Sequence, residues 1–196
     1  VKENPVRGYE RQKEYKRTES LTVEEIHKFI EVARDYVRRF VTIAVTTGLR
    51  SSNILNLRWE QINLENKIIF ISGKETKNGK NLCIPIIPLL EQELLKTPVE
   101  KRTGYVICKE NGEKFGDIRK AYYNDLKKAG ISRKVWNHDL RHTFGSQVAM
   151  AGIDAFTIKE LMGHKNIQVT ERYTHLSFMH KREVIEKLDI RLTHNN

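Results

Sequence analysis

A largely apolar run from Val37 to Thr47 is the feature that most restricts how this chain can fold. It stops at Gly48, and glycine readily takes the left-handed backbone conformation with which many helices end. No stretch of the chain approaches the ~18 consecutive apolar residues that a membrane span needs. We therefore predict a buried core helix over 37–47, against which other elements pack, and no transmembrane segment.

Helical patterns border this central segment on both sides. Thr22-x-x-Glu25 is a capping box, and apolar residues then recur at helical intervals, which predicts a helix over roughly 23–35. A short helix is predicted over Ser51–Leu57, with one of its first two residues, both serines, as the N-terminal cap. Arg50 then lies at the joint between two helices.

Short strands are predicted in the middle of the chain. Lys67–Ser72 and Asn81–Ile86 are β-branched, apolar runs, and the connection between them contains Asn78-Gly79, a strong turn signal. These two segments are predicted to form a β-hairpin. Tyr105–Phe115 is predicted to hold two more short strands around Asn111-Gly112.

The rest of the chain has helical patterns of moderate length that end at glycines. Two of them cover 88–96 and 117–129, the second ending at Gly130. The last third, from His138 onward, is predicted to form three or four short helices broken at Gly152 and Gly163, with a final amphipathic segment near 178–188. The chain is therefore predicted to have an α+β fold that is mostly helical, with a small antiparallel sheet.

The first part of the chain differs from the rest. Residues 1–20 are polar, contain Pro5 and Gly8, and show no apolar periodicity, so we interpret them as a linker. Residues 21–196 are predicted to form one domain, because a chain of 23.0 kDa has room for a single hydrophobic core. A linker at this position leads us to expect a further domain upstream of it.

The charge balance indicates the class of partner. Lys and Arg exceed Asp and Glu by ten, and a surplus of this size favours polyanions, with nucleic acid first among them. Cys83 and Cys108 lack the spacing of a zinc site and form no disulfide framework, and no secretory signal is visible, so we expect a reducing cytoplasm. Motifs for nucleotide cofactors and common metal sites are also missing from the sequence, so no cofactor and no metal are predicted.

The candidate chemical groups are cations in apolar or turn contexts, together with one tyrosine. His138 and Arg141 have the i, i+3 spacing that places both side chains on one face of a helix, where they can bind one oxyanion. Each group alone also has an ordinary structural explanation, such as a helix cap, a solvated turn or a partly buried hydroxyl. The full candidate set is Arg50, Lys77, His138, Arg141, His164 and Tyr173.

Taken in order, the motifs around these residues resemble those of the tyrosine recombinases of the phage integrase family. The matching segments run through nearly the whole chain, and they are Thr47-Gly-Leu-Arg50, Leu55-x-Leu57-x-Trp59, Lys77 eight residues before Pro85, His138-x-x-Arg141, Leu161-Met-Gly-His164, and Tyr173 nine residues later. The resemblance implies the fold of a tyrosine recombinase catalytic domain.

The resemblance also implies roles for the candidate residues. Tyr173 would attack a DNA phosphate and form a covalent 3′-phosphotyrosyl link, without metal or ATP. Arg50 and Arg141 would clamp the non-bridging oxygens, and His164 would add another donor. Lys77 would protonate the leaving 5′ oxygen, and His138 would assist proton transfer from the tyrosine or hold the phosphate.

Two positions depart from the common family pattern. Asn53 stands where many members have a glutamate, which we expect to tune activity without abolishing it. Met162 replaces the leucine that is common before the Gly-His pair, a change that conserves volume.

The partners follow from the same resemblance. It implies site-specific recombination of double-stranded DNA, in the integration or excision of a mobile element. It also implies a homo-tetramer that assembles through the helix after Tyr173, with accessory DNA-bending proteins as further partners. Two alternatives stay open. One is a DNA-binding regulator that makes no cut, and the other is a type IB topoisomerase, whose larger DNA clamp does not fit into 196 residues.

Overall fold

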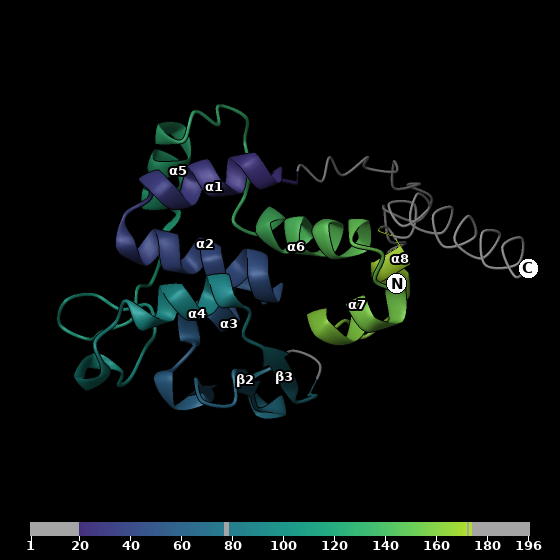
Figure 1. Cartoon of the computed structure of the whole chain (residues 1–196), viewed down its shortest axis with the longest axis horizontal. Coiled ribbons are helices and arrows are strands. Elements are labelled where there is room, and N and C mark those ends of the chain that lie inside the picture. The colour runs from purple at the N-terminus through teal and green to yellow at the C-terminus, as the bar shows by residue number, and fades with distance from the viewer. Residues whose placement is uncertain (1–19, 77–78, 172, 174–196) are drawn as a thin grey trace, which may run out of the picture.

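The computed structural model describes residues 20–76, 79–171 and 173, and its centre is helix α2 (Asp35–Thr47). This helix contacts α1 (Val23–Val32), α3 (Ser51–Asn56), α4 (Pro88–Leu95), α5 (Arg119–Lys128) and α6 (Asp139–Met150). Figure 1 shows α1 and α5 on one side of α2 and the sheet on the other. The predicted core helix and the mostly helical α+β fold are therefore confirmed.

The end of α2 is set by Gly48, as predicted. Its φ of 63° is left-handed, and an added Cβ would lie 2.4 Å from the ring of Phe144 on α6. A larger residue would meet both a strained backbone and a steric clash. The glycine thus lets α6 pass close to the end of α2, and this crossing positions the candidate site.

Helix α1 begins at the predicted capping box but ends before residue 35. Thr22 Oγ1 accepts a hydrogen bond from the Glu25 backbone, and the Glu25 carboxylate accepts one from Thr22. The helix ends at Val32 because Arg34 is extended, and both its backbone and its guanidinium donate to the buried Asp125 carboxylate on α5. This contact spans 91 positions of sequence and leaves no local signal.

The sheet has three antiparallel strands in the order β1–β2–β3. The predicted hairpin is confirmed as β2 (Ile68–Ile71) and β3 (Leu82–Pro85), and β1 (Ile62–Asn63) is an additional short strand. The inner face buries Ile69 opposite Ile84. The connection from β2 to β3 begins with a 3₁₀ turn, η2 (Gly73–Glu75), so its described part is longer than a two-residue turn.

Two local predictions are wrong. Tyr105–Phe115 contains no strand, because Tyr105 makes only an isolated bridge to Arg58, and Cys108 makes one to Lys114 around a tight turn. The cap of α3 is not a serine, because the helix begins one residue earlier than that assignment requires. Its N-cap is Arg50, which makes no capping hydrogen bond through its side chain.

The remaining helices form a smaller unit beside the central core (Figure 1). Here α6, α7 (Ala155–Met162) and α8 (Gln168–Glu171) follow one another, with left-handed glycines at 152 and 163 as predicted. Two further 3₁₀ turns are η1 (Trp59–Gln61) and η3 (Val99–Lys101). Phe144, Ala149, Ile158, Met162 and Tyr173 form an apolar cluster separate from the main core.

Some predictions lie outside the described residues. These are most of the linker over 1–20 and the amphipathic segment near 178–188. Within the part of the chain that the structure describes, no helix combines the length and apolar character needed to cross a bilayer.

Candidate active site

Arg141 lies at the centre of the candidate site, between the ends of two helices. Its side chain is 5% exposed, and its Nη1 and Nη2 atoms donate to the carbonyl oxygens of Gly48 and Met162, each at 2.5 Å. These carbonyls end α2 and α7, where helices carry partial negative charge. A guanidinium has five N–H donors, so two bonds orient the group and three donors are left for an anion.

Two neighbours affect the charge of this guanidinium. Burial and the nearby Arg50 cation lower the pKa of Arg141 to about 10, while Tyr173 acts in the opposite direction. The pKa still lies well above neutral pH, so Arg141 stays protonated there. The two arginines and the tyrosine, which are far apart in sequence, therefore belong to one site.

Arg50 reaches this site from the joint between α2 and α3. Leu49 before it is buried in the core, whereas Arg50 is half-buried and extended. One turn along α3, the Nδ2 atom of Asn53 is buried without a hydrogen-bond partner among the described residues. The two neighbouring arginine cations give this region a preference for an anion.

Tyr173 is held over the middle of α6. The side chain is 4% exposed, and its ring covers Gly145, where an added Cβ would lie 2.6 Å from Cζ. Its Oη atom is 2.7 Å from Nδ1 of His142, which is a hydrogen-bond distance. The tyrosine is thus fixed on its ring face and at its hydroxyl.

Sequence reasoning missed His142 as a functional residue. It lies four positions after His138, and the two rings are perpendicular with centroids 5.5 Å apart. The i, i+4 spacing on a predicted helix was a usable signal, because such residues share one face. His138 itself is exposed and occupies the N-cap of α6, so the histidine that touches the tyrosine is the second of the pair.

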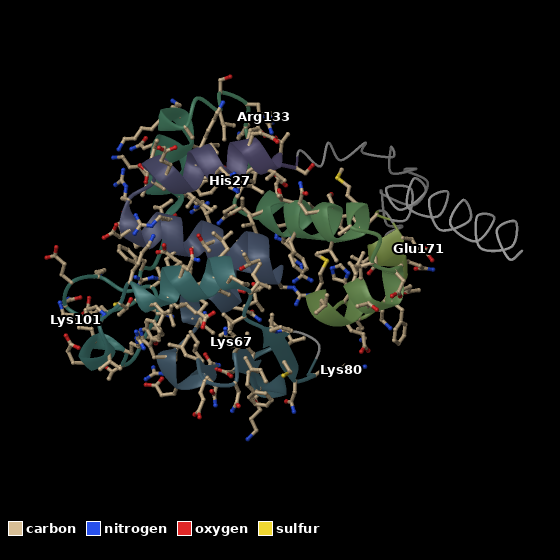
Figure 2. The ribbon with its side chains drawn as sticks, viewed as in Figure 1. His27, Lys67, Lys80, Lys101, Arg133 and Glu171 are labelled. Carbon is tan, nitrogen blue, oxygen red and sulfur yellow. The ribbon has the colours of Figure 1, made fainter. Side chains whose placement is uncertain are left out.

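His164 lies at the other side of the site, directly after α7. Its Nδ1 is 2.8 Å from Oγ1 of the buried Thr170. It also lines a cavity of about 480 Å³ between α7 and β3, together with Lys80 and Leu82. Lys80 lies in the connection between β2 and β3 (Figure 2), so the histidine and this connection face one space.

The structure therefore brings most of the predicted residues into one region. Arg50, Arg141 and Tyr173 are linked through their charges, and His138 is linked to Tyr173 through His142. Lys77 lies outside the described residues. Among the described residues, no group of three His, Cys, Asp or Glu side chains could hold a metal ion.

The sequence is similar to those of curated recombinases and integrases. The tyrosine recombinase XerA of Pyrococcus furiosus is 37% identical over 185 residues, which cover 87% of this chain and 62% of that protein. The integrase of Salmonella phage P22 is 30% identical and matches over 89% of this chain and 48% of its own length. The chain therefore spans about half to two thirds of the length of these curated relatives.

Solved structures of recombinases and integrases have folds similar to that of this chain. A XerA recombinase superposes with a TM-score of 0.70 at 27% identity, over 86% of this chain and 63% of that one. The catalytic domain of bacteriophage HP1 integrase has a TM-score of 0.65 at 26% identity, and the match covers 90% of this chain and 94% of that domain. A XerH site-specific recombinase bound to its difH substrate has a TM-score of 0.65 at 26% identity, over 80% and 50% of the two chains.

A protein-family model also matches most of the chain. The model of the phage integrase family covers residues 19–180, which include all of the candidate residues named above. The arginines, histidines and tyrosine that gather around α6 are consistent with this match. The match establishes that the chain belongs to the phage integrase family.

Proposed function

We propose that residues 21–196 form a catalytic domain that cuts and rejoins double-stranded DNA at specific sites through a covalent phosphotyrosine intermediate. The observation that carries this proposal is the tyrosine hydroxyl hydrogen-bonded to His142 beside a buried, protonated arginine. The DNA-bound state of the similar XerH structure and the names of the relatives support DNA as the substrate.

The proposed reaction is a transesterification at one phosphate. Tyr173 Oη forms a bond to phosphorus, and the bond from phosphorus to the 5′ oxygen breaks, which leaves a 3′-phosphotyrosyl link and a 5′-hydroxyl. Attack by a 5′-hydroxyl reverses the step and rejoins the strand. Arg50 and Arg141 hold the non-bridging oxygens and stabilise the negative charge that grows in the transition state, with His164 as a further donor.

Two protons must move in this reaction. A tyrosine hydroxyl has an ordinary pKa of about 10 and needs a base or nearby cations to react near neutral pH. We assign proton acceptance to His142, because its Nδ1 already lies 2.7 Å from the hydroxyl. His138 supports that ring from its edge and contacts the phosphate, and Lys77 protonates the leaving oxygen.

Replacing His142 tests the assignment of the base. We expect His142→Ala to slow covalent capture of DNA about 100-fold, because general-base catalysis typically contributes at least that much. His142→Asn places an amide near the position of Nδ1, so it keeps a hydrogen bond to Tyr173 but cannot accept the proton. Rates of capture at fixed pH are the measurement, with His27→Ala on the exposed face of α1 as the control. A full rate in the Asn variant would reduce His142 to a positioning residue.

The wider context is also part of the proposal. The reaction serves integration or excision of a mobile element, in the cytoplasm. A homo-tetramer on paired sites assembles through the helix after Tyr173, with accessory DNA-bending proteins. A DNA-binding domain joined through residues 1–20 completes the protein, and the greater length of the relatives supports this.

The test is covalent trapping in EDTA. The protein is incubated with a pool of nicked duplexes of random sequence and quenched in detergent, and we expect a protein–DNA band on a denaturing gel. Capture in EDTA separates tyrosine chemistry, in which arginines supply the positive charge, from a metal-dependent nuclease. Binding without capture, also in a chain extended to the full length of the relatives, would instead favour the non-catalytic regulator.

A further inference from the structure

Trp136 is a large aromatic side chain that lies outside both apolar clusters of the fold. It is 47% exposed, whereas Trp59, the other tryptophan of the chain, is 6% exposed. Leaving an indole in water forgoes the free energy of burying it. Trp136 precedes His138 by two residues, so their Cα atoms are at most about 7 Å apart. An exposed indole therefore borders the candidate site.

The backbone around Trp136 is held firmly. Its amide donates to Oδ2 of Asp139 at 2.8 Å, and its carbonyl accepts from the amide of Asp139 at 2.8 Å. Earlier in the same loop, Arg133 forms an ion pair with Glu25 on α1, and Figure 2 shows Arg133 between α5 and α6. The loop that carries the indole is thus fixed to two helices.

The ring itself is also oriented. The ring of Tyr123 on α5 meets that of Trp136 at 80°, with the centroids 6.1 Å apart. Edge contacts of this kind fix an aromatic ring while leaving much of its surface free. The indole is therefore exposed to solvent in one orientation, so a flat partner can stack on it.

The charge beside the ring favours one kind of partner. Lys134 Nζ lies 4.3 Å from the centroid of the indole, whereas Arg119, one turn before Tyr123 on α5, is ion-paired with Asp117. Lysine is depleted in the cores of protein–protein interfaces. An aromatic face combined with cations is the usual arrangement for binding nucleotides, since the ring stacks and the cation neutralises phosphate. The surface thus fits a nucleic acid better than another protein.

We propose that Trp136 positions the DNA by stacking on the nucleotide next to the phosphate held by Arg50 and Arg141, while Lys134 neutralises a neighbouring phosphate. The inference rests on the proposed function, because it takes the substrate from there. It adds a contact to the nucleotide itself, outside the set of phosphate-binding residues. Stacking accepts any base, so it serves positioning and not the choice of sequence.

Iodide quenching of fluorescence tests this proposal in the unaltered chain. Iodide reaches exposed indoles, so the quenched signal comes from Trp136 and not from the buried Trp59. We expect a short duplex with a one-nucleotide gap to protect Trp136 more strongly than an intact duplex, since bases next to a gap are less stacked. Heparin, a polyanion without bases, is expected to leave the indole open to iodide.

Variants measure the contribution of the ring. We expect Trp136→Ala to weaken binding of the gapped duplex about tenfold, within the range for one stacked base, and Trp136→Phe to restore most of it. Thermal unfolding checks that each variant is folded. The matched control is Tyr105→Ala, because Tyr105 is half-buried, also has a lysine, Lys114, over its ring, and does not line the cavity beside His164. It is expected to bind like the unaltered chain.

The outcomes separate this inference from the proposed function. If the duplex shifts the protein on a native gel while Trp136 stays open to iodide and Trp136→Ala binds normally, the inference is wrong and the proposed function stands. If the protein binds no duplex even at low salt, both fail. Protection that rises with protein concentration in the absence of DNA would show that the indole is a protein contact and overturn the inference.

Discussion

Tyr173→Phe is expected to abolish covalent capture of DNA. The variant lacks the hydroxyl oxygen that bonds to phosphorus in the proposed reaction, so we expect a loss on the order of a thousandfold or more, as for other nucleophiles removed from enzymes. The phenyl ring still covers Gly145 and fills the small apolar cluster, so the fold is retained. The measurement is the detergent-resistant protein–DNA band formed on nicked duplexes.

The same variant has two internal controls. DNA affinity on a native gel is expected to be unchanged, because binding depends on the cations. Loss of the hydrogen bond to His142 costs about 1 kcal/mol, which corresponds to a melting temperature lowered by roughly 2–4 °C. Capture by Tyr173→Phe would assign the nucleophile to another residue and contradict the proposed mechanism.

Arg141→Ala is expected to remove both activity and stability. The substitution leaves the carbonyls of Gly48 and Met162 buried without their donor and opens a cavity between α2, α6 and α7. Unsatisfied buried acceptors and a cavity together cost about 3 kcal/mol of unfolding free energy or more. Urea denaturation measures this loss, and DNA capture is expected to be undetectable under conditions where the protein is still folded.

Arg50→Ala is the matched comparison. Arg50 is half-buried and its side chain makes no capping hydrogen bond to α3, so its removal is expected to leave the free energy of unfolding nearly unchanged. We expect capture to fall by about two to three orders of magnitude, the range for one donor to a growing anionic charge. Equal stability losses in the two variants would contradict the assignment of a structural role to Arg141 alone.

A lysine at position 141 separates charge from geometry. Arg141→Lys keeps the positive charge, but an ammonium cannot reach two carbonyls and a phosphate in the planar arrangement of a guanidinium. We expect part of the stability to return and the activity to stay low. Full activity would show that charge is sufficient at this position.

The helices and the hairpin could be predicted because their signals are local. The end of α2 at Gly48 and the capping box of α1 depend on residues that are close in sequence. The early end of α1 could not be predicted, because it depends on Arg34 meeting Asp125 from a distant helix. The strands predicted over Tyr105–Phe115 failed for a related reason, since strand formation needs a partner that the pattern does not name.

The candidate site was predictable as a set but not as an arrangement. The family resemblance pointed to the arginines and the tyrosine, and the structure places Arg50, Arg141 and Tyr173 together. It did not reveal that His142 contacts the hydroxyl, or that two helix ends meet at Arg141. The i, i+4 spacing could have placed His142 beside His138, but the contacts of Arg141 depend on how α6 crosses α2 and α7, which no spacing within the sequence encodes.

The small apolar cluster around Tyr173 makes the nucleophile part of a separate cooperative unit. Proteins open locally in units whose free energies range from near zero up to that of global unfolding. We expect the packing of α7 and α8 on α6 to open while α2 and the main core stay intact, because neither α7 nor α8 contributes a residue to the main core, whereas α6 packs on α2. Amide hydrogen exchange would report this as earlier deuterium uptake in α7 than in α2. Tyr173, the proposed nucleophile, thus belongs to the part of the described structure that is expected to open first.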